Sequence, residues 1–129
     1  MPIAIRMAVN TSPAIKVMTC SVILHLPLLE VDNALQLLQS VKARIQAKPG
    51  CLLCLVTRNA NEDDCLYYNE KWESEAAFRR HVQSDEFQRV LIAMDLCREE
   101  PQIEVGELLG HSGIEYLRQL RETMGEKVK

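Results

Sequence analysis

The chain has 129 residues, of which 47% are hydrophobic and 26% are charged, and its formal net charge is −3. This length suits one domain with a core of its own, and the share of apolar residues excludes a disordered chain. The acidic balance argues against nucleic acid as a partner, because phosphate backbones select basic surfaces. No apolar run is long enough for a bilayer helix, and the first residues lack a signal-peptide pattern, so we expect a cytoplasmic protein without a membrane partner.

The first part of the chain predicts an arm, a strand and a helix. Residues 1–13 are rich in turn formers and are expected to form a loose arm. Residues 15–26 are rich in β-branched and apolar residues, which predicts a strand that Pro27 ends. Apolar residues then recur at intervals of three and four over 31–45, which is the spacing of an amphipathic helix. Proline and glycine at positions 49 and 50 stop this helix.

The middle of the chain predicts a hairpin followed by a broken helix. Residues 51–58 and 65–72 form its two strands, and the polar segment 59–64 forms the turn between them. Ser74 can cap a short helix. Ser84 can cap a second helix that restarts directly after the first.

The last part of the chain predicts a fourth strand and a terminal helix. Pro101 ends the second short helix, and residues 102–109 follow as a strand. Ser112 and Glu115 have the spacing of a capping box at the start of the terminal helix. One side of that helix is apolar and is expected to dock on the domain or on a partner subunit: Ile114, Leu117, Leu120 and Met124.

The order strand–helix–strand–strand–helix–strand predicts an α+β protein with a ferredoxin-like antiparallel sheet. This domain is expected to span residues 14–110, with the extra C-terminal helix and tail over 111–129. The strands are rich in apolar residues on both sides, whereas the helices of such a fold cover only one face of the sheet. A second copy of the chain is the simplest cover for the other face, so we expect a homodimer with its sheets packed face to face.

The cysteines are expected to be free thiols without a metal. They are an odd number in a chain large enough to fold without bridges: Cys20, Cys51, Cys54, Cys65 and Cys97. Cys51 and Cys54 have the spacing of a redox or zinc pair. In a regular strand, however, residues three apart point to opposite faces. His25 has neither a carboxylate nor a cysteine at ligand spacing, so the sequence predicts no metal site.

The strand 65–72 and the helix after it hold the candidate site residues. Tyr68, Glu70 and Trp72 share one face of the strand by its period of two. Trp72 can be a core anchor, or it can be the aromatic wall of a pocket for a flat ligand with the Tyr68 hydroxyl as a polar point. His81 borders an apolar stripe, where a histidine is either a satisfied structural residue or an acid–base group. Arg89 falls on the second short helix, where the simplest interpretation is a solvated face.

Three motifs occur in order along this region. Pro49-Gly50 precedes the second strand, Glu70-x-Trp72 ends the third, and His81-x-x-Ser84 lies in the following helix. Together they resemble the antibiotic-biosynthesis monooxygenase superfamily, whose members are small dimeric α/β-barrel proteins. The resemblance extends over about residues 15 to 109.

The resemblance implies a cofactor-independent monooxygenase. The best-understood relatives oxidise quinols or anthrone-like polyphenols with molecular oxygen and without metal, flavin or haem. By this resemblance Trp72 and Phe78 bind a small aromatic substrate, and the groups that could stabilise or accept its proton are Tyr68, His81 and Arg89. Tyr68 replaces an asparagine of polyketide-type relatives, and Phe78 lacks the phenolic oxygen found there.

A second interpretation stays open, in which the chain is a non-catalytic dimeric barrel that binds an apolar ligand or a partner protein. Scattered site residues, or a cavity filled by core side chains, would favour it.

Overall fold

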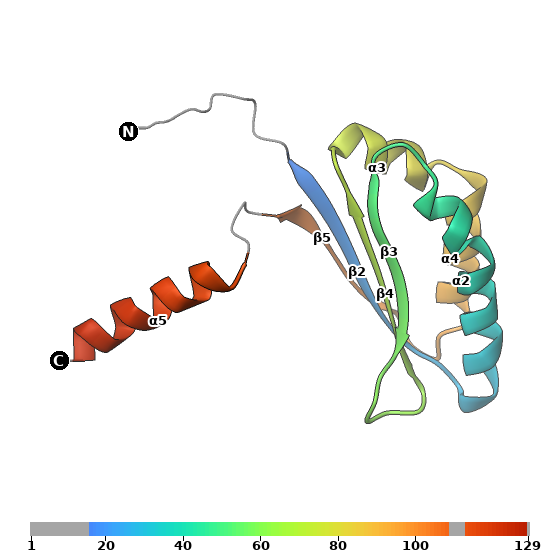
Figure 1. Ribbon diagram of the computed structural model, residues 1–129. Coiled ribbons are helices and arrows are strands. Elements are labelled where there is room, and N and C mark those ends of the chain that lie inside the picture. Colours follow the sequence, from blue (N-terminus) through green and yellow to red (C-terminus); the bar gives the residue numbers. More distant parts are fainter. Residues whose placement is uncertain (1–15, 109–112, 129) are drawn as a thin grey trace.

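The computed structural model describes residues 16–108 and 113–128, and side chains up to residue 122. A layer of helices covers one face of a twisted sheet (Figure 1). The strands are β2 (Val17–His25), β3 (Cys51–Arg58), β4 (Cys65–Trp72) and β5 (Gln102–Leu108). The helices are the short 3₁₀ helix η1 (Leu28–Glu30), α2 (Val31–Gln46), α3 (Glu75–Val82), α4 (Asp85–Asp95) and α5 (Ile114–Val128). None of the described helices is long and apolar enough to cross a membrane.

The four strands form one sheet in the order β3-β4-β2-β5, and every neighbouring pair is antiparallel. This order and the alternation with helices confirm the predicted ferredoxin-like α+β fold. The sheet is open rather than closed into a barrel. The predicted arm over 1–13 and the predicted cap at Ser112 lie outside the described residues.

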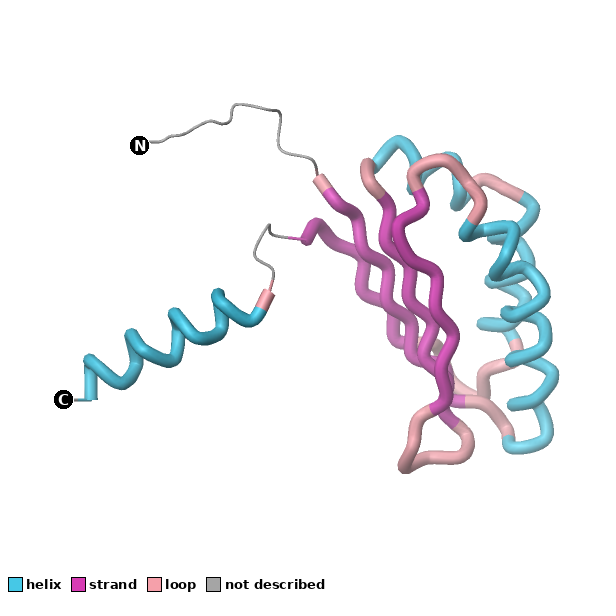
Figure 2. Tube along the Cα trace, in the orientation of Figure 1, coloured by secondary structure: helices cyan, strands magenta, loops and turns pink. Residues whose placement is uncertain are grey.

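The core lies between the sheet and the helices (Figure 2). Alternate residues of β2 are buried, beginning with Met18 and Cys20, because every second side chain faces the helices. The buried residues of α2 are those of the predicted stripe: Val31, Ala34, Leu38, Val41 and Ile45. Burying this stripe supplies most of what holds the helix in place.

The other face of the sheet is mixed rather than apolar, which corrects the expectation of strands apolar on both sides. Thr19 and Ser21 lie on this face of β2, and Lys71 and Asn69 are their partners on β4. Leu55 of β3 lies beside Asn69 and is exposed. Apolar side chains are therefore interspersed with polar ones on the face without helices.

A β-bulge in β3 changes the direction of the two cysteines near its start. Cys51 pairs with Trp72 and Cys54 pairs with Glu70, with an irregularity of register between Cys51 and Leu53. Since Trp72 and Glu70 lie on the same face of β4, the two cysteines also share a face. The prediction of opposite faces was wrong because a bulge adds one residue to a strand. All five cysteines are free in the structure, as predicted.

The helix break between α3 and α4 is as predicted. The Ser74 Oγ accepts a hydrogen bond from the Ala77 N–H (3.1 Å), and the Ser84 Oγ accepts one from the Phe87 N–H (3.3 Å). The two serines thus cap two separate helices.

The terminal helix α5 stands apart from the sheet and the helix layer (Figure 1). Three residues of its predicted apolar side are exposed by 59%, 62% and 47%: Ile114, Leu117 and Leu120. These three side chains therefore do not dock on the rest of the chain, which was one of the two expected docking places. The side chain of Met124 lies outside the described residues.

Candidate active site

A buried carboxylate lies at the centre of the candidate site. Glu70, on the helix-facing side of β4, is only 1% exposed. Its Oε1 accepts a hydrogen bond from the Trp72 indole N–H (2.8 Å). Its Oε2 accepts one from the Tyr68 hydroxyl and contacts His81 Nε2 at 2.8 Å. Three partners therefore replace the water that the carboxylate loses on burial.

The hydrogen-bond partners of His81 assign its tautomer. The Lys48 ammonium lies 3.0 Å from Nδ1 of His81, and an ammonium can only donate. Nδ1 must then be the acceptor, so the proton of the neutral ring sits on Nε2 and is donated to Glu70. A carboxylate that holds one nitrogen of a histidine leaves the other nitrogen ready to take a proton.

Lys48 connects this buried group to the surface. It also donates to the Ser84 Oγ (2.7 Å) and forms an ion pair with Glu86 (2.9 Å). Its side chain is about one-fifth exposed and that of Glu86 one-quarter. A continuous line of polar contacts thus runs from solvent through Lys48 and His81 to Glu70.

Aromatic rings enclose the imidazole. The Trp72 ring stacks on His81 with 4.6 Å between ring centroids, and Phe87 meets it edge-on at 5.3 Å. A cavity of about 170 Å³ adjoins this stack, and its lining consists of Lys48, Pro49, Trp72, Ala77, Arg80 and His81. The cavity combines an aromatic wall with cationic groups, which suits a small aromatic anion.

The Pro49-Gly50 motif holds the loop under this cavity close to α3. Gly50 has φ +87°, which side-chain-bearing residues rarely adopt, and a Cβ there would lie 2.7 Å from the Cβ of Ala77. The Gly50 carbonyl accepts a hydrogen bond from the Glu73 N–H (2.8 Å), just before α3. Glycine therefore lets the turn after α2, which carries Lys48, approach the start of α3.

The structure brings together some of the predicted site residues. Tyr68, Trp72 and His81 all contact Glu70, and Trp72 and His81 line the cavity. Tyr68 is fully buried and lies behind Glu70. Burial, followed by the nearby charge of Glu70, raises the pKa of the Tyr68 hydroxyl, so this group stays protonated and donates.

Two predicted site residues lie elsewhere. Phe78 lines a different, more apolar groove of about 290 Å³ together with Met18, Val82 and Val105. Arg89 is exposed on α4 and is not among the residues that line the cavity beside Trp72.

Two site residues were not singled out by the sequence. The sequence motif includes Glu70 but does not mark it as the centre of the site, although an acidic residue between two aromatics on one strand face is a signal of a buried charge. Lys48 directly precedes the Pro49-Gly50 stop of the predicted helix, and no motif marks it as a site residue. Its contact with His81 joins residues far apart in the chain, and no spacing rule reveals such a contact.

Residues 30–91 match the model of the family described as antibiotic biosynthesis monooxygenase. This segment, just under half of the chain, is similar to antibiotic biosynthesis monooxygenases. The matched range contains every residue of the Glu70–His81–Lys48 line and the wall of the cavity. A comparison with curated proteins gave no match.

Solved structures with the same fold include proteins of this family and others without an assigned role. A candidate antibiotic biosynthesis monooxygenase from Caulobacter crescentus is 21% identical, with a TM-score of 0.66 over 73% of this chain and 91% of that one. A Bacteroides thetaiotaomicron protein of unknown function, described as a possible oxidoreductase, is 19% identical, with a TM-score of 0.67 over 74% and 100%. Rv0793 from Mycobacterium tuberculosis is 15% identical, with a TM-score of 0.67 over 75% and 99%. At these identities the likeness shows the fold alone.

Proposed function

We propose that the protein is a cofactor-independent monooxygenase that oxidises a small phenol or quinol with molecular oxygen. The observation that carries this proposal is the line Lys48–His81–Glu70, because Lys48 and His81 also line the cavity beside Trp72. Such a line provides a proton acceptor and a positive charge beside a flat binding surface. Both are needed to form a phenolate, the electron-rich species that reacts with oxygen.

The first step is removal of the phenolic proton. The phenol O–H takes the place of Lys48 as the donor to His81 Nδ1, and the ring accepts the proton there. The resulting imidazolium is paired with Glu70 at Nε2, so the buried carboxylate stabilises the charge as it forms. The Lys48 ammonium then lies against the phenolate oxygen and lowers its energy.

The second step is reaction with oxygen. The phenolate gives one electron to O₂, and the resulting aryloxyl radical and superoxide combine to form a carbon–oxygen bond. The proton held by His81 completes the hydroperoxide. The attacked carbon then loses its hydrogen as the O–O bond breaks, and the terminal OH group leaves with that proton as water. This leaves a quinone carbonyl, so one oxygen atom enters the product and the other leaves as water. The protein contributes orientation and exclusion of bulk solvent.

The volume of the cavity bears on the size of the substrate. Clefts for drug-sized ligands span about 300–1,000 Å³. The cavity beside Trp72, at about 170 Å³, suits one or two fused rings. Arg80 and Lys48 both line the cavity. Their positive charge favours a hydroxylated ring, which can become an anion, over a neutral hydrocarbon.

A second candidate function, binding of an apolar ligand without catalysis, is favoured by the groove at Phe78. This groove, at about 290 Å³, is larger than the cavity beside Trp72, and most of its lining is apolar. In this function Glu70 and His81 would serve only to hold β4 and α3 together.

Oxygen uptake distinguishes the two functions. Purified protein is mixed with a panel of hydroquinones of one or two fused rings, and oxygen consumption is compared with the spontaneous rate. If the protein is a monooxygenase, the rate of oxygen uptake should exceed the background rate. It should fall about 100-fold or more in Lys48→Met, which is the range typical of lost acid–base and charge stabilisation. Lys42→Met removes a lysine of α2 that does not line the cavity and should retain the rate. Uptake at the background rate across the panel would favour the binding function.

A further inference from the structure

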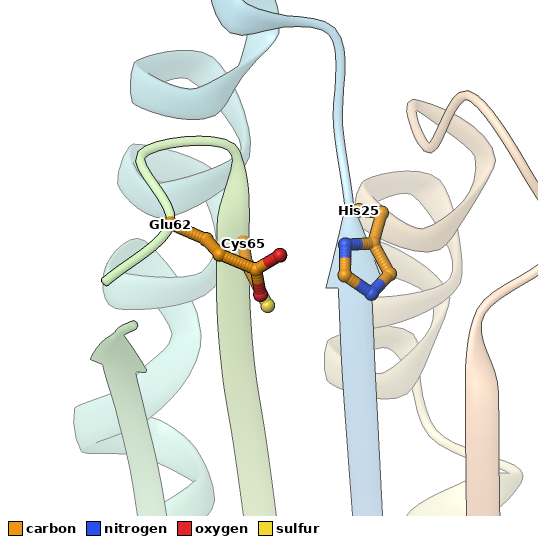
Figure 3. Close-up of side chains that lie close together, drawn as sticks. All are labelled: His25, Glu62 and Cys65. Carbon is orange, nitrogen blue, oxygen red and sulfur yellow. The ribbon is translucent and has the colours of Figure 1, made fainter. Parts of the chain in front are cut away.

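Three side chains with metal-binding atoms lie together at the end of β4 opposite to Glu70 and Trp72 (Figure 3). His25 ends β2 and Cys65 begins β4, and the two are direct cross-strand partners. Glu62 belongs to the hairpin loop, which folds back so that the Cys65 N–H donates to the Glu62 carbonyl (3.4 Å). One ligand atom from each of the three side chains lies within 4.8 Å of the other two.

One imidazole nitrogen of His25 has no hydrogen-bond partner among the described residues. Within residues 16–108 and 113–122, its Nδ1 is the one buried side-chain nitrogen or oxygen that has no hydrogen-bond partner. A buried polar atom without a partner is costly, and native proteins leave few of them. Figure 3 shows the ring beside the Glu62 carboxylate and the Cys65 sulfur. An ion bound between these groups would give the nitrogen a partner.

We propose that His25, Glu62 and Cys65 bind one divalent transition-metal ion, with Zn²⁺ as the best match. The donor set is one imidazole nitrogen, one carboxylate oxygen and one thiolate sulfur. Zn²⁺ accepts this mixture of donors in a tetrahedral site, whereas Mg²⁺ and Ca²⁺ prefer oxygen alone. Three protein ligands leave the fourth position to water.

The loop around the site is held by hydrogen bonds that orient its ligands. The Asn59 Nδ2 donates to Glu62 Oε1 (3.3 Å), and the Asn59 Oδ1 accepts from the backbone N–H groups of Asn61 (2.7 Å) and Glu62 (3.2 Å). Hydrogen bonds of this kind position the ligands of known metal sites. On the strand side, the His25 carbonyl accepts from the Arg98 N–H (3.0 Å), which fixes the backbone of the histidine.

The proposed metal site is separate from the proposed oxidation site around Glu70 and Trp72. Glu70 lies five residues beyond Cys65 along β4, about 17 Å at the rise of a strand. The ion would therefore tie the hairpin loop to the end of β2 and stabilise that end of the sheet. The proposal does not depend on the proposed monooxygenase activity, and neither does its test.

Cobalt titration of the full-length, tag-free, reduced protein tests the proposal. Co²⁺ reports a thiolate ligand through a charge-transfer absorption band, and Zn²⁺ should abolish the band by displacement. We expect one Co²⁺ per chain, no such band in Cys65→Ser, and binding weaker by about tenfold or more in Glu62→Gln. Glu62 is exposed, so this second variant keeps the fold even if Cys65→Ser does not.

A matched control comes from the other end of the sheet. Cys51→Ser removes a cysteine that pairs with Trp72, and it should leave the band and the affinity unchanged. Zn²⁺ should also raise the melting temperature of the wild type more than that of Glu62→Gln. Absence of stoichiometric binding by the wild type, or equal binding by wild type and Glu62→Gln, would overturn the proposal.

Discussion

The carboxylate of Glu70 is held in the core by three partners, which gives it a structural role. Glu70→Gln replaces one acceptor oxygen with an amide nitrogen that can only donate. At least one of the three partners then loses its acceptor while remaining buried. We expect a loss of about 1–3 kcal/mol in the free energy of unfolding, measured by urea denaturation.

The control for this substitution is Glu75→Gln on α3. Glu75 is exposed and pairs with Arg79 at 3.6 Å, a contact between exposed side chains that contributes little. Its loss should change stability by less than about 0.5 kcal/mol. Equal stabilities of Glu70→Gln and the wild type would contradict the described network.

The cysteines are expected to react with alkylating reagents at different rates, because their thiols are buried to different extents. Burial, with a smaller contribution from the charge of Glu70, raises the pKa of Cys20 to about 12. Burial raises the pKa of Cys54 to about 11. Thiols with raised pKa values hold little of the reactive thiolate at mildly alkaline pH.

We therefore predict that iodoacetamide modifies the partly exposed Cys51 and Cys97 of the native protein before it modifies Cys20 or Cys54. Mass spectrometry of peptides from a time course measures the order. After denaturation without reductant, every cysteine should react. Early modification of Cys20, or a Cys51–Cys54 disulfide, would contradict the structure.

At the scale of elements, the break between α3 and α4 positions the candidate site. Ser84 caps α4, donates its hydroxyl proton to the His81 carbonyl (2.6 Å) and accepts a hydrogen bond from Lys48 (2.7 Å). The helix break thus fixes the end of the helix that carries His81 and holds Lys48 beside it. This explains physically why histidine and serine occur together at this spacing.

A comparison of two caps tests this role. Ser74→Ala and Ser84→Ala each remove an N-cap and should cost about 0.5–2 kcal/mol of unfolding free energy. Only Ser84→Ala also releases Lys48, so only this variant should lose quinol oxidation beyond what its stability explains. Stability from thermal unfolding and oxygen uptake are measured on the same preparations. Equal activity of the two variants would show that Ser84 acts only as a cap.

Regular elements were accessible to prediction because each depends on local signals. The stripe of α2, the stop at Pro49-Gly50 and the serine caps all lie within short windows of sequence. The bulge in β3 was not predicted, since nothing local to Cys51 marks an extra residue in the strand. It reversed the inference about which way the two cysteines point.

The candidate site was predicted in part. Trp72, Tyr68 and His81 were found because their motif lies along one strand and the next helix. Their common partner, Glu70, lies on the same strand face, but the strand pattern alone does not predict that this carboxylate is buried. The contacts of Lys48 with His81, and of His25 with Cys65, depend on how distant segments meet, which the sequence pattern does not encode locally.

At the scale of the whole molecule, two surfaces are not covered by any of the residues that the structure describes. The open face of the sheet carries apolar side chains such as Leu53 and Ile23 between polar ones, and α5 exposes Ile114 and Leu117. A helix of this length gains most of its stability from packing rather than from propensity. We propose that a second copy of the chain covers both surfaces.

Sedimentation at micromolar protein should then give twice the chain mass of 14.7 kDa. Truncation after Gly110 removes α5 and should lower the melting temperature or shift the protein toward monomer. A stable monomer at all concentrations would contradict the dimer. A truncated protein identical to the full chain in both measurements would show that α5 does not contribute to it.

The most direct test of the proposed chemistry compares His81 with Arg89, both of which are predicted from the sequence as groups that could stabilise or accept the substrate's proton. The kcat/KM for quinol oxidation, followed by oxygen uptake, is measured for wild type, His81→Gln and Arg89→Gln after circular dichroism has shown that each is folded. We predict a loss of about 100-fold or more for His81→Gln, because the proposed mechanism uses its ring as the proton acceptor. Arg89→Gln, which changes an exposed residue away from the cavity, should match the wild type. Full activity in folded His81→Gln would contradict the proposed mechanism.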